Sequence, residues 1–149
     1  MGRNWNEGDT FLLVTGASRG LGQAFAIAMA GYLGSRSIIY LTGRTESDLT
    51  QSRNAILKKN ERLQVEYFII DHANAKRETY VNMLQGIAPS QFGSAIIIHN
   101  AGSIGRQGKM VRDYGDKEEL NDYYNLNLFS VAILNSVFMR IFSSGMILI

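Results

Sequence analysis

The chain has 149 residues, of which 46% are hydrophobic and 19% charged, a balance typical of one globular domain and not of a disordered segment. It contains no cysteine, which excludes disulfide bonds and thiolate metal sites. The net charge of +2 comes from scattered Lys and Arg, so we expect no nucleic-acid partner. The polar segment Met1–Asp9 lacks the apolar centre of a signal peptide, and we expect one domain, 1–149, in the cytoplasm.

Apolar runs alternate with helical patterns along the chain. The runs are continuous and rich in β-branched residues, as in strands buried on both faces, and they span Thr10–Thr15, Ser37–Thr42, Val65–Ile70 and Ala95–His99. The first helical pattern opens at the end of the glycine-rich stretch Thr15–Gly22 and is indicated by Leu21, Ala24, Phe25, Ala28, Met29 and Tyr32. The second, Glu46–Asn60, begins behind Thr45-x-x-Asp48, which resembles a capping box.

Three more helices are expected in the second half of the chain. They span Ala75–Gly86, with Val81 and Leu84 facing inward, then Asp116–Tyr124 and Leu126–Phe142. Met146–Ile149 is expected to begin a fifth strand. This alternation predicts an α/β fold, a Rossmann-type doubly wound parallel sheet truncated before or within the fifth strand.

The apolar segment from Leu126 to the last residue invites a membrane interpretation. Asn127, Asn135 and Arg140 interrupt it, and a central arginine is costly in lipid. We therefore expect a buried or dimer-facing helix and no membrane partner.

A glycine-rich turn, Thr15–Gly22, joins the first strand to the first helix. Backbone N–H groups at such a helix start can hold a dinucleotide pyrophosphate, and the glycines permit the tight turn and the close approach. The alternative is a glycine-rich loop without a ligand. The predicted cofactor-binding residues here are Gly16, Ala17, Ser18, Arg19, Gly20, Leu21 and Gly22.

Further candidates follow the other strands. Gly43 and Arg44 end the second strand where an NAD site usually has an acid; Arg44 and Arg19 favour the 2′-phosphate of NADP, although both can simply be solvated. Asp71 can accept from the adenine amino group or cap a helix, and either role is compatible with the other.

Two histidines lie near the same strand ends. His72 is included with the cofactor-binding residues, and we expect it at the surface and not in catalysis; His99 is expected to be packed. With so few histidines, no metal site is expected. Small residues after the fourth strand, Asn100, Ala101 and Gly102, are expected to line the cofactor ribose.

Together, Thr15-Gly16-x-x-x-Gly20-x-Gly22, Asp71 and Asn100-Ala101-Gly102 resemble the short-chain dehydrogenase/reductase family, with His99 where many members have a second Asn. The resemblance implies an NADP-dependent oxidoreductase acting on carbonyl or CH–OH groups, and commonly a homodimer. Asn127 matches the family's catalytic asparagine, which kinks its helix and supports a proton relay. A closer resemblance is to a branch that reduces a pterin side-chain carbonyl in tetrahydrobiopterin synthesis; it rests on Leu13–Gly20, Gly43-Arg44, Asn100–Gly105 and Asn121–Leu128.

The family's chemistry also needs a Ser and a Tyr-x-x-x-Lys. No tyrosine here has Lys four residues later; Tyr114 and Lys117 are three apart and precede Asn127. We therefore expect the cofactor-binding half of a carbonyl reductase, inactive alone. The alternatives are a non-catalytic NADP-binding or dimerising module that pairs with full-length enzyme, and a reductase of another small carbonyl compound.

Overall fold

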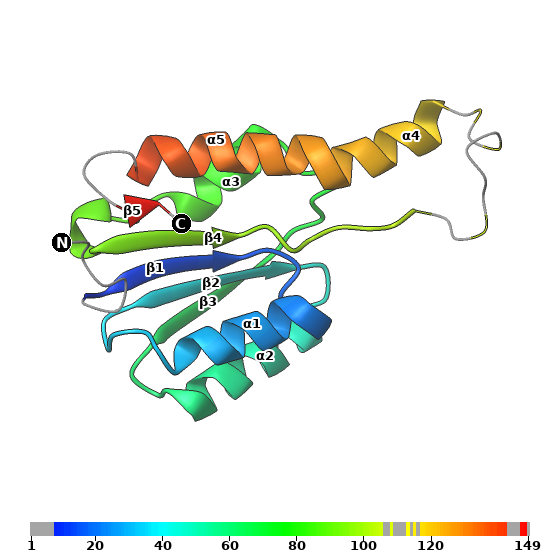
Figure 1. Cartoon of the computed structure of the whole chain (residues 1–149). Coiled ribbons are helices and arrows are strands. Elements are labelled where there is room, and N and C mark those ends of the chain that lie inside the picture. The colour runs from blue at the N-terminus through cyan, green and yellow to red at the C-terminus, as the bar shows by residue number, and fades with distance from the viewer. Residues whose placement is uncertain are drawn as a thin grey trace.

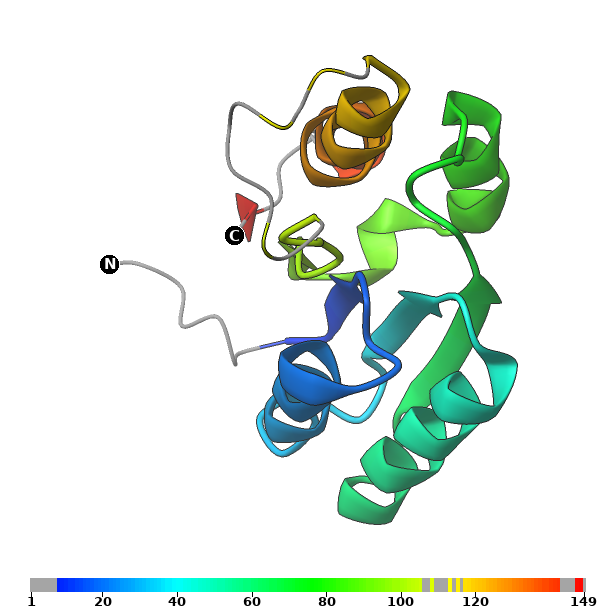
Figure 2. The same ribbon diagram turned by 90° about the vertical axis from the view of Figure 1, so that its right-hand side faces the viewer.

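The computed structural model describes residues 8–105, 108, 113, 115, 117–142 and 147–148. Its centre is a parallel sheet in the order β3-β2-β1-β4-β5, with helices on both faces (Figures 1 and 2). The strands are β1 Thr10–Val14, β2 Ile38–Gly43, β3 Gln64–Ile69, β4 Ser94–Ile98 and β5 Ile147–Leu148. The predicted fold class is confirmed, and β1–β4 lie within one residue of their predicted bounds.

The helices fall into two layers. One face of the sheet carries α1 Gly20–Ala30 and α2 Glu46–Lys59 (Figure 1). The other carries α3 Arg77–Leu84 and a continuous helical segment of α4 Lys117–Tyr124, the π-helical turn η3 Asn125–Phe129 and α5 Ser130–Phe142, while the 3-10 turn η1 Pro89–Gln91 precedes β4. This layering brings the carboxyl ends of β1–β4 to one edge.

Strand alternation divides the core between these layers. Phe11 and Leu13 of β1 pack into the cluster beneath α3 and α5, whereas Leu12 and Val14 pack into the cluster beneath α1 and α2. All four side chains are fully buried. This explains why β1 has no polar alternation: both of its faces are covered.

Helix α1 forms where predicted, but its large apolar side chains do not face the sheet. The buried positions are Gly22, Ala26 and Ala30, whereas Leu21 and Phe25 are 71% and 49% exposed. The reason is distance: a Cβ on Gly22 would lie 2.5 Å from the Gly16 carbonyl oxygen, so only small residues fit against the turn.

Two local expectations for α2 and α3 were wrong. Thr45 precedes α2, which ends one residue before its predicted end, but the Thr45 side chain makes no capping hydrogen bond. In α3, Leu84 is buried as predicted, but Val81 is 43% exposed and Tyr80 takes the inward position. Position 116, the predicted start of the next helix, lies outside the described residues.

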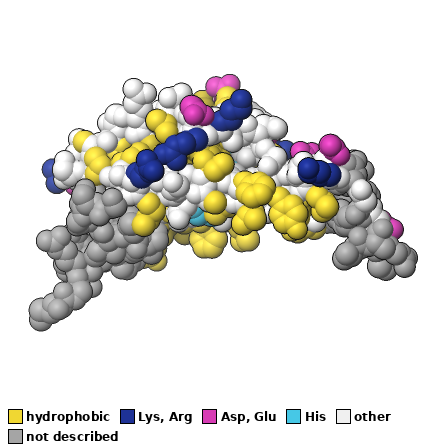
Figure 3. Space-filling view, turned by 90° about the horizontal axis from the view of Figure 1, so that it is seen from above, with side chains coloured by type: hydrophobic (Ala, Val, Ile, Leu, Met, Phe, Trp, Pro, Cys, Tyr) yellow, Lys and Arg dark blue, Asp and Glu magenta, His cyan; other side chains and the backbone are white. Residues whose placement is uncertain are grey.

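The long helix packs one face on the core. Leu134, Val137, Phe138 and Phe142 of α5 are buried, although Leu120–Phe142 is also long and apolar enough to cross a membrane by length and composition, a test that core helices pass as well. Figure 3 looks down on this side of the molecule and shows hydrophobic side chains gathered along it. Exposed ones on the helical segment include Leu128, Phe129 and Met139.

Candidate functional site

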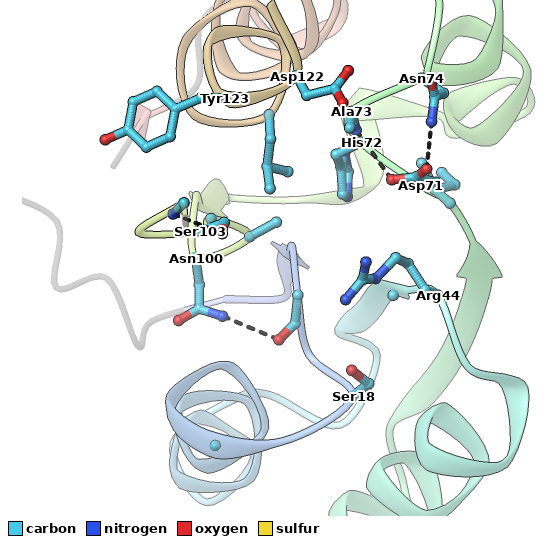
Figure 4. A pocket seen from close by; sticks show the side chains of 18 of the residues that line it. Ser18, Arg44, Asp71, His72, Ala73, Asn74, Asn100, Ser103, Asp122 and Tyr123 are labelled. Carbon is cyan, nitrogen blue, oxygen red and sulfur yellow. Dashed lines mark hydrogen bonds between the residues drawn. The ribbon is translucent and has the colours of Figure 1, made fainter. Parts of the chain in front are cut away.

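An open cavity of about 1250 Å³ lies at the carboxyl edge of the sheet, where an open α/β sheet binds its ligands (Figure 4). Its walls come from the turns after β1–β4 and from the helical segment that contains η3. Among the predicted residues, those that line it are Gly16, Ser18, Arg19, Gly20, Gly43, Arg44, Asp71, His72, Asn100, Ala101 and Gly102. Ala17, Leu21, Gly22 and Asn127 do not line it.

The glycine turn is anchored on both sides. The Thr15 N–H donates to the Ile98 carbonyl at 3.0 Å, and the Ala17 N–H donates to the Thr42 carbonyl at 2.9 Å. Gly16 and Gly20 have φ of 64° and 61°, the left-handed region that glycine adopts without strain. A Cβ on Gly16 would also lie 2.9 Å from the Ala101 Cα, so this turn and the end of β4 meet backbone to backbone.

Thr15 and Asn100 lock these two strand ends together. The backbone N–H groups of Asn100 and Ala101 both donate to Thr15 Oγ1 at 3.0 Å. In return the Asn100 side-chain amide donates to the carbonyls of Thr15 and Gly16, at 3.2 and 3.0 Å. Figure 4 shows the Asn100 side chain at the cavity with one hydrogen bond drawn from it. Asn100 thus shapes the turn as well as lining the cavity. Thr15 was not predicted as a site residue, and a hydroxyl side chain at the first position of the glycine turn is the signal that could have found it.

Asp71 lines the cavity but does not cap a helix. Helix α3 begins only at Arg77, and Asp71 instead accepts from the Ala73 N–H at 3.2 Å and from the Asn74 amide at 2.6 Å (Figure 4). The helix-cap expectation was therefore wrong: Asp71 stabilises the turn after β3.

The expectation of a surface position for His72 was also wrong. His72 is 5% exposed and is held between Thr42 Oγ1, at 2.7 Å from its Nε2, and the Tyr80 hydroxyl, at 2.9 Å from its Nδ1. Burial lowers the pKa of His72 to about 4; nearby Asp71 opposes this shift and His99 adds to it. The imidazole is therefore neutral at pH 7.

His99 is half-buried at the end of β4. Burial lowers its pKa, and a hydrogen bond with Asn135 partly opposes this. Its Nε2 is buried and has no hydrogen-bond partner within the described part of the chain. The predicted packed position agrees with this burial.

The two predicted phosphate-binding arginines lie on one wall of the cavity, after β1 and after β2. Both Arg19 and Arg44 are exposed. In the described ranges the only salt bridge joins Arg36 and Asp9 at 2.8 Å, so neither cavity arginine is neutralised by an acid there.

Asn127 lies in the middle of η3. Its Oδ1 accepts from the Ser103 N–H at 3.0 Å, and its Nδ2 donates to the Tyr123 carbonyl at 2.9 Å. A Cβ on Gly102 would lie 3.1 Å from the same Oδ1, which explains the glycine. Asn127 therefore ties the π-helical turn to the loop after β4, and Ser103 of that loop lines the cavity.

Two further points from the sequence concern Tyr114 and the expected absence of a metal site. Tyr114 lies outside the described residues. Within the described residues, no group of three or more His, Asp or Glu side chains is arranged to hold a metal ion.

Comparison with known proteins agrees with this geometry. Residues 10–148 match the family model described as short chain dehydrogenase. The chain belongs to this family. Rat sepiapterin reductase is 31% identical over 138 residues, which are 89% of this chain and 52% of the relative. Benzil reductase of Bacillus subtilis is 30% identical over 135 residues, 89% of this chain and 49% of that one. The chain thus spans about half the length of these relatives.

Solved structures show the same fold. A short-chain dehydrogenase of Shigella flexneri, complexed with NADP, superposes with a TM-score of 0.75 at 26% identity, over 93% of this chain and 56% of that one. One from Pseudomonas syringae gives a TM-score of 0.76 at 24% identity, over 95% and 55% of the two chains. The predicted resemblance to this family, in particular to sepiapterin reductase, is confirmed.

Proposed function

We propose that the cavity binds NADPH and that the chain is the cofactor-binding half of a carbonyl reductase acting on a small, pterin-like substrate. The observation that carries the proposal is the pair Arg19 and Arg44 beside the glycine turn, with no acid at the end of β2. An acid there would select NAD by accepting from the ribose 2′-OH, whereas arginines favour a 2′-phosphate.

The start of α1 fits the pyrophosphate. Helix α1 begins at Gly20, and Arg19 before it makes no side-chain capping bond. No acid lies in the first turn of the helix, so its free N–H groups and its positive dipole end can bind an anion. The Shigella flexneri protein of the same fold is complexed with NADP, which supports a nicotinamide dinucleotide as the ligand.

The remaining lining residues fit the rest of the cofactor. Asp71 would meet the adenine and Asn100–Gly102 the ribose. Bound NADPH would supply the hydride for the carbonyl carbon. Asn127 would support the proton path to the carbonyl oxygen by holding η3 on the loop after β4. The family's Ser and Tyr-x-x-x-Lys are not present in the sequence, so we expect no turnover from this chain alone.

The substrate proposal rests on the relatives. Several sepiapterin reductases, from rat, cattle and frog, are 29–31% identical to this chain, which supports a pterin carbonyl and a role in tetrahydrobiopterin synthesis. Benzil reductase and a steroid dehydrogenase-like relative of Caenorhabditis elegans, at 30% and 29% identity, keep other small carbonyl compounds as the alternative. We also propose a cytoplasmic location, which a sequence without cysteine fits.

A second candidate function is favoured by the exposed apolar side chains along the long helix. Leu128 and Phe129 lie on one turn of the segment and Met139 about three turns later, and these side chains are 41–52% exposed. Exposed apolar side chains of this kind favour pairing with another copy or with a full-length enzyme. Co-purification of tagged full-length enzyme with the chain tests this, and absence of a complex would count against it.

Cofactor preference gives the primary test. We would titrate NADPH and NADH against the wild-type chain, Arg44→Ala and the control Arg62→Ala, whose arginine is exposed and lies outside the cavity lining. Charge-assisted hydrogen bonds are worth about 1.5–3 kcal/mol, so Arg44→Ala should lower the NADPH-to-NADH affinity ratio about tenfold or more, and Arg62→Ala should not. An unchanged ratio in Arg44→Ala would disprove the NADP assignment. Steady turnover of sepiapterin by the chain with NADPH would disprove the inactivity.

A further inference from the structure

A buried serine of helix α2 holds the glycine turn from the side away from the cavity. Helices α1 and α2 lie side by side on one face of the sheet (Figures 1 and 2). Ser52 of α2 is 0% exposed, and its hydroxyl donates to the Ala17 carbonyl of the turn at 2.8 Å. The same oxygen accepts from the Gln23 side-chain amide of α1 at 2.8 Å. One side chain of α2 thus contacts both the glycine turn and the helix that follows it.

Ala17 is the residue at which the turn is fixed to the rest of the molecule. Its N–H donates to the Thr42 carbonyl of β2 at 2.9 Å, and its carbonyl accepts from Ser52. Ala17 is fully buried and does not line the cavity, whereas the next residues, Ser18–Gly20, do. The part of the turn that faces the cavity therefore extends from a residue whose N–H and carbonyl are both bound.

The two contacts of Ser52 enclose the residues that would meet the phosphates. Ala17 precedes Ser18–Gly22, and Gln23 follows this segment. Glycines restrict φ and ψ very little, so a turn rich in glycine needs outside contacts to keep one shape. A turn that already has the bound shape loses less conformational entropy when it binds an anion. Ser52 supplies such contacts on both sides of the segment.

The hydroxyl of Ser52 has a second acceptor within its own helix. The Asp48 carbonyl, one turn earlier in α2, lies 3.0 Å from it, a contact that buried serines in helices often make. The contact with Ala17 is the shorter one. Without the hydroxyl, the Ala17 carbonyl would lose this donor and the Gln23 amide this acceptor, where little water can replace them.

We propose that Ser52 is a positioning residue that sets the shape of the phosphate-binding turn through Ala17 and Gln23. That the turn binds phosphate rests on the proposed function, whereas the positioning of the turn does not. A dinucleotide bound through its pyrophosphate depends on this contact whether or not it carries a 2′-phosphate. Ser52 therefore determines the affinity for both dinucleotides, and Arg44 determines the choice between them.

The first test follows amide hydrogen exchange without a ligand. The Ala17 N–H reports on the turn, and Leu12, which is fully buried in the central strand β1, reports on global unfolding. Ser52→Ala should speed exchange at Ala17 about fivefold relative to Leu12, the loss expected for one hydrogen bond. An unchanged ratio of the two exchange rates would overturn the proposal.

The matched control is Ser37→Ala. Ser37 is also 0% exposed, and its hydroxyl oxygen accepts from the Thr10 N–H at 2.9 Å, at the end of the sheet opposite the cavity. The substitution removes one buried hydroxyl of the same kind, but not one that contacts the turn. The ratio of the Ala17 and Leu12 exchange rates should stay at the wild-type value. A change as large as that in Ser52→Ala would show a general loss of stability and would overturn the positioning role.

Two larger side chains separate the hydroxyl of Ser52 from its volume. Ser52→Thr and Ser52→Val introduce side chains of nearly the same shape, and only threonine carries a hydroxyl. Exchange at Ala17 relative to Leu12 should be about fivefold slower in Ser52→Thr than in Ser52→Val. Equal rates in these two variants would show that the hydroxyl does not hold the turn.

Titration of NADPH and NADH distinguishes this proposal from the proposed function. Ser52→Ala should weaken the binding of both about fivefold and leave their affinity ratio unchanged, whereas Ser37→Ala should change neither affinity. A loss of stability alone does not lower the affinity while most of the protein is folded. Wild-type affinities in Ser52→Ala would overturn the positioning role and leave the NADPH site intact. If the wild-type chain binds neither dinucleotide, the proposed function fails, and the exchange rates still decide whether Ser52 positions the turn.

Discussion

Replacing Gly22 by alanine tests how α1 is seated on the glycine turn. The added Cβ would lie 2.5 Å from both the Gly16 carbonyl oxygen and the Asn100 amide nitrogen, where ordinary contacts begin near 3.4 Å. Those two atoms are themselves hydrogen-bonded at 3.0 Å, so the methyl group would sit against their bond. Helix α1 must then shift by about 1 Å, or Asn100 must leave the turn.

The change in the free energy of unfolding of Gly22→Ala combines two costs with one gain. Overpacking costs about 1–3 kcal/mol, and a lost Asn100–Gly16 hydrogen bond costs about 1 kcal/mol. The helix propensity of alanine over glycine returns about 1 kcal/mol. The free energy of unfolding of Gly22→Ala should therefore fall by about 2 kcal/mol.

Urea denaturation followed by circular dichroism measures this change. With a slope of about 1.5 kcal/mol per molar urea, the midpoint should fall by about 1.3 M. Gly115→Ala is the control, because a Cβ there meets nothing within 4 Å and the backbone is not left-handed. Its free energy of unfolding should stay within about 0.5 kcal/mol of the wild-type value. A Gly22→Ala midpoint at or above the wild-type value would refute the close packing described for the turn.

Two further changes probe the support of the site. Ser52 of α2 is fully buried, its hydroxyl donates to the Ala17 carbonyl at 2.8 Å, and the Gln23 amide donates to that hydroxyl. Ser52→Ala should therefore lower the free energy of unfolding by about 1–3 kcal/mol. A loss smaller than the error of urea denaturation would contradict this. The pKa of His72 is lowered from 6.5 to about 4, so the unfolded state binds a proton that the folded state refuses as the pH falls through this window. The free energy of unfolding should be unaffected by His72 above pH 6.5 and should fall by about 3 kcal/mol towards pH 4. In His72→Asn this dependence is lost while that of His99 remains, so the stability gap between wild type and variant should narrow on acidification. Urea denaturation of both proteins at pH 7.5 and 4.5 measures this difference in the free energy of unfolding. A difference that does not change with pH would show that burial does not lower the pKa of His72.

The strands were predictable from sequence because the central sheet is covered on both faces. Short, continuous apolar runs such as Phe11–Val14 that alternate with helical patterns indicate strands buried on both faces of a sheet. The face of α1 was not predictable in this way. Its buried stripe is made of Gly22, Ala26 and Ala30, and small residues give a weak hydrophobic signal beside the exposed Leu21 and Phe25.

Part of the candidate site was also predictable from the sequence, and part was not. The residues of the glycine turn and of Asn100–Gly102 could be placed at the cavity because strand ends determine their position. The partners of His72 could not, because Thr42 lies on another strand and Tyr80 reaches the imidazole only through the packing of α3 on the sheet. The same holds for Asp71, whose hydrogen bonds depend on where α3 begins.

Titration calorimetry of NADPH against the wild-type chain tests the central claim most directly. We predict saturable one-to-one binding that adenosine 2′,5′-bisphosphate displaces, because Arg19, Arg44 and the start of α1 lie together at the cavity, and neither arginine forms a salt bridge among the described residues. The absence of binding heat up to about 1 mM NADPH would mean a binding free energy weaker than about 4 kcal/mol. That result would contradict the proposed NADPH site.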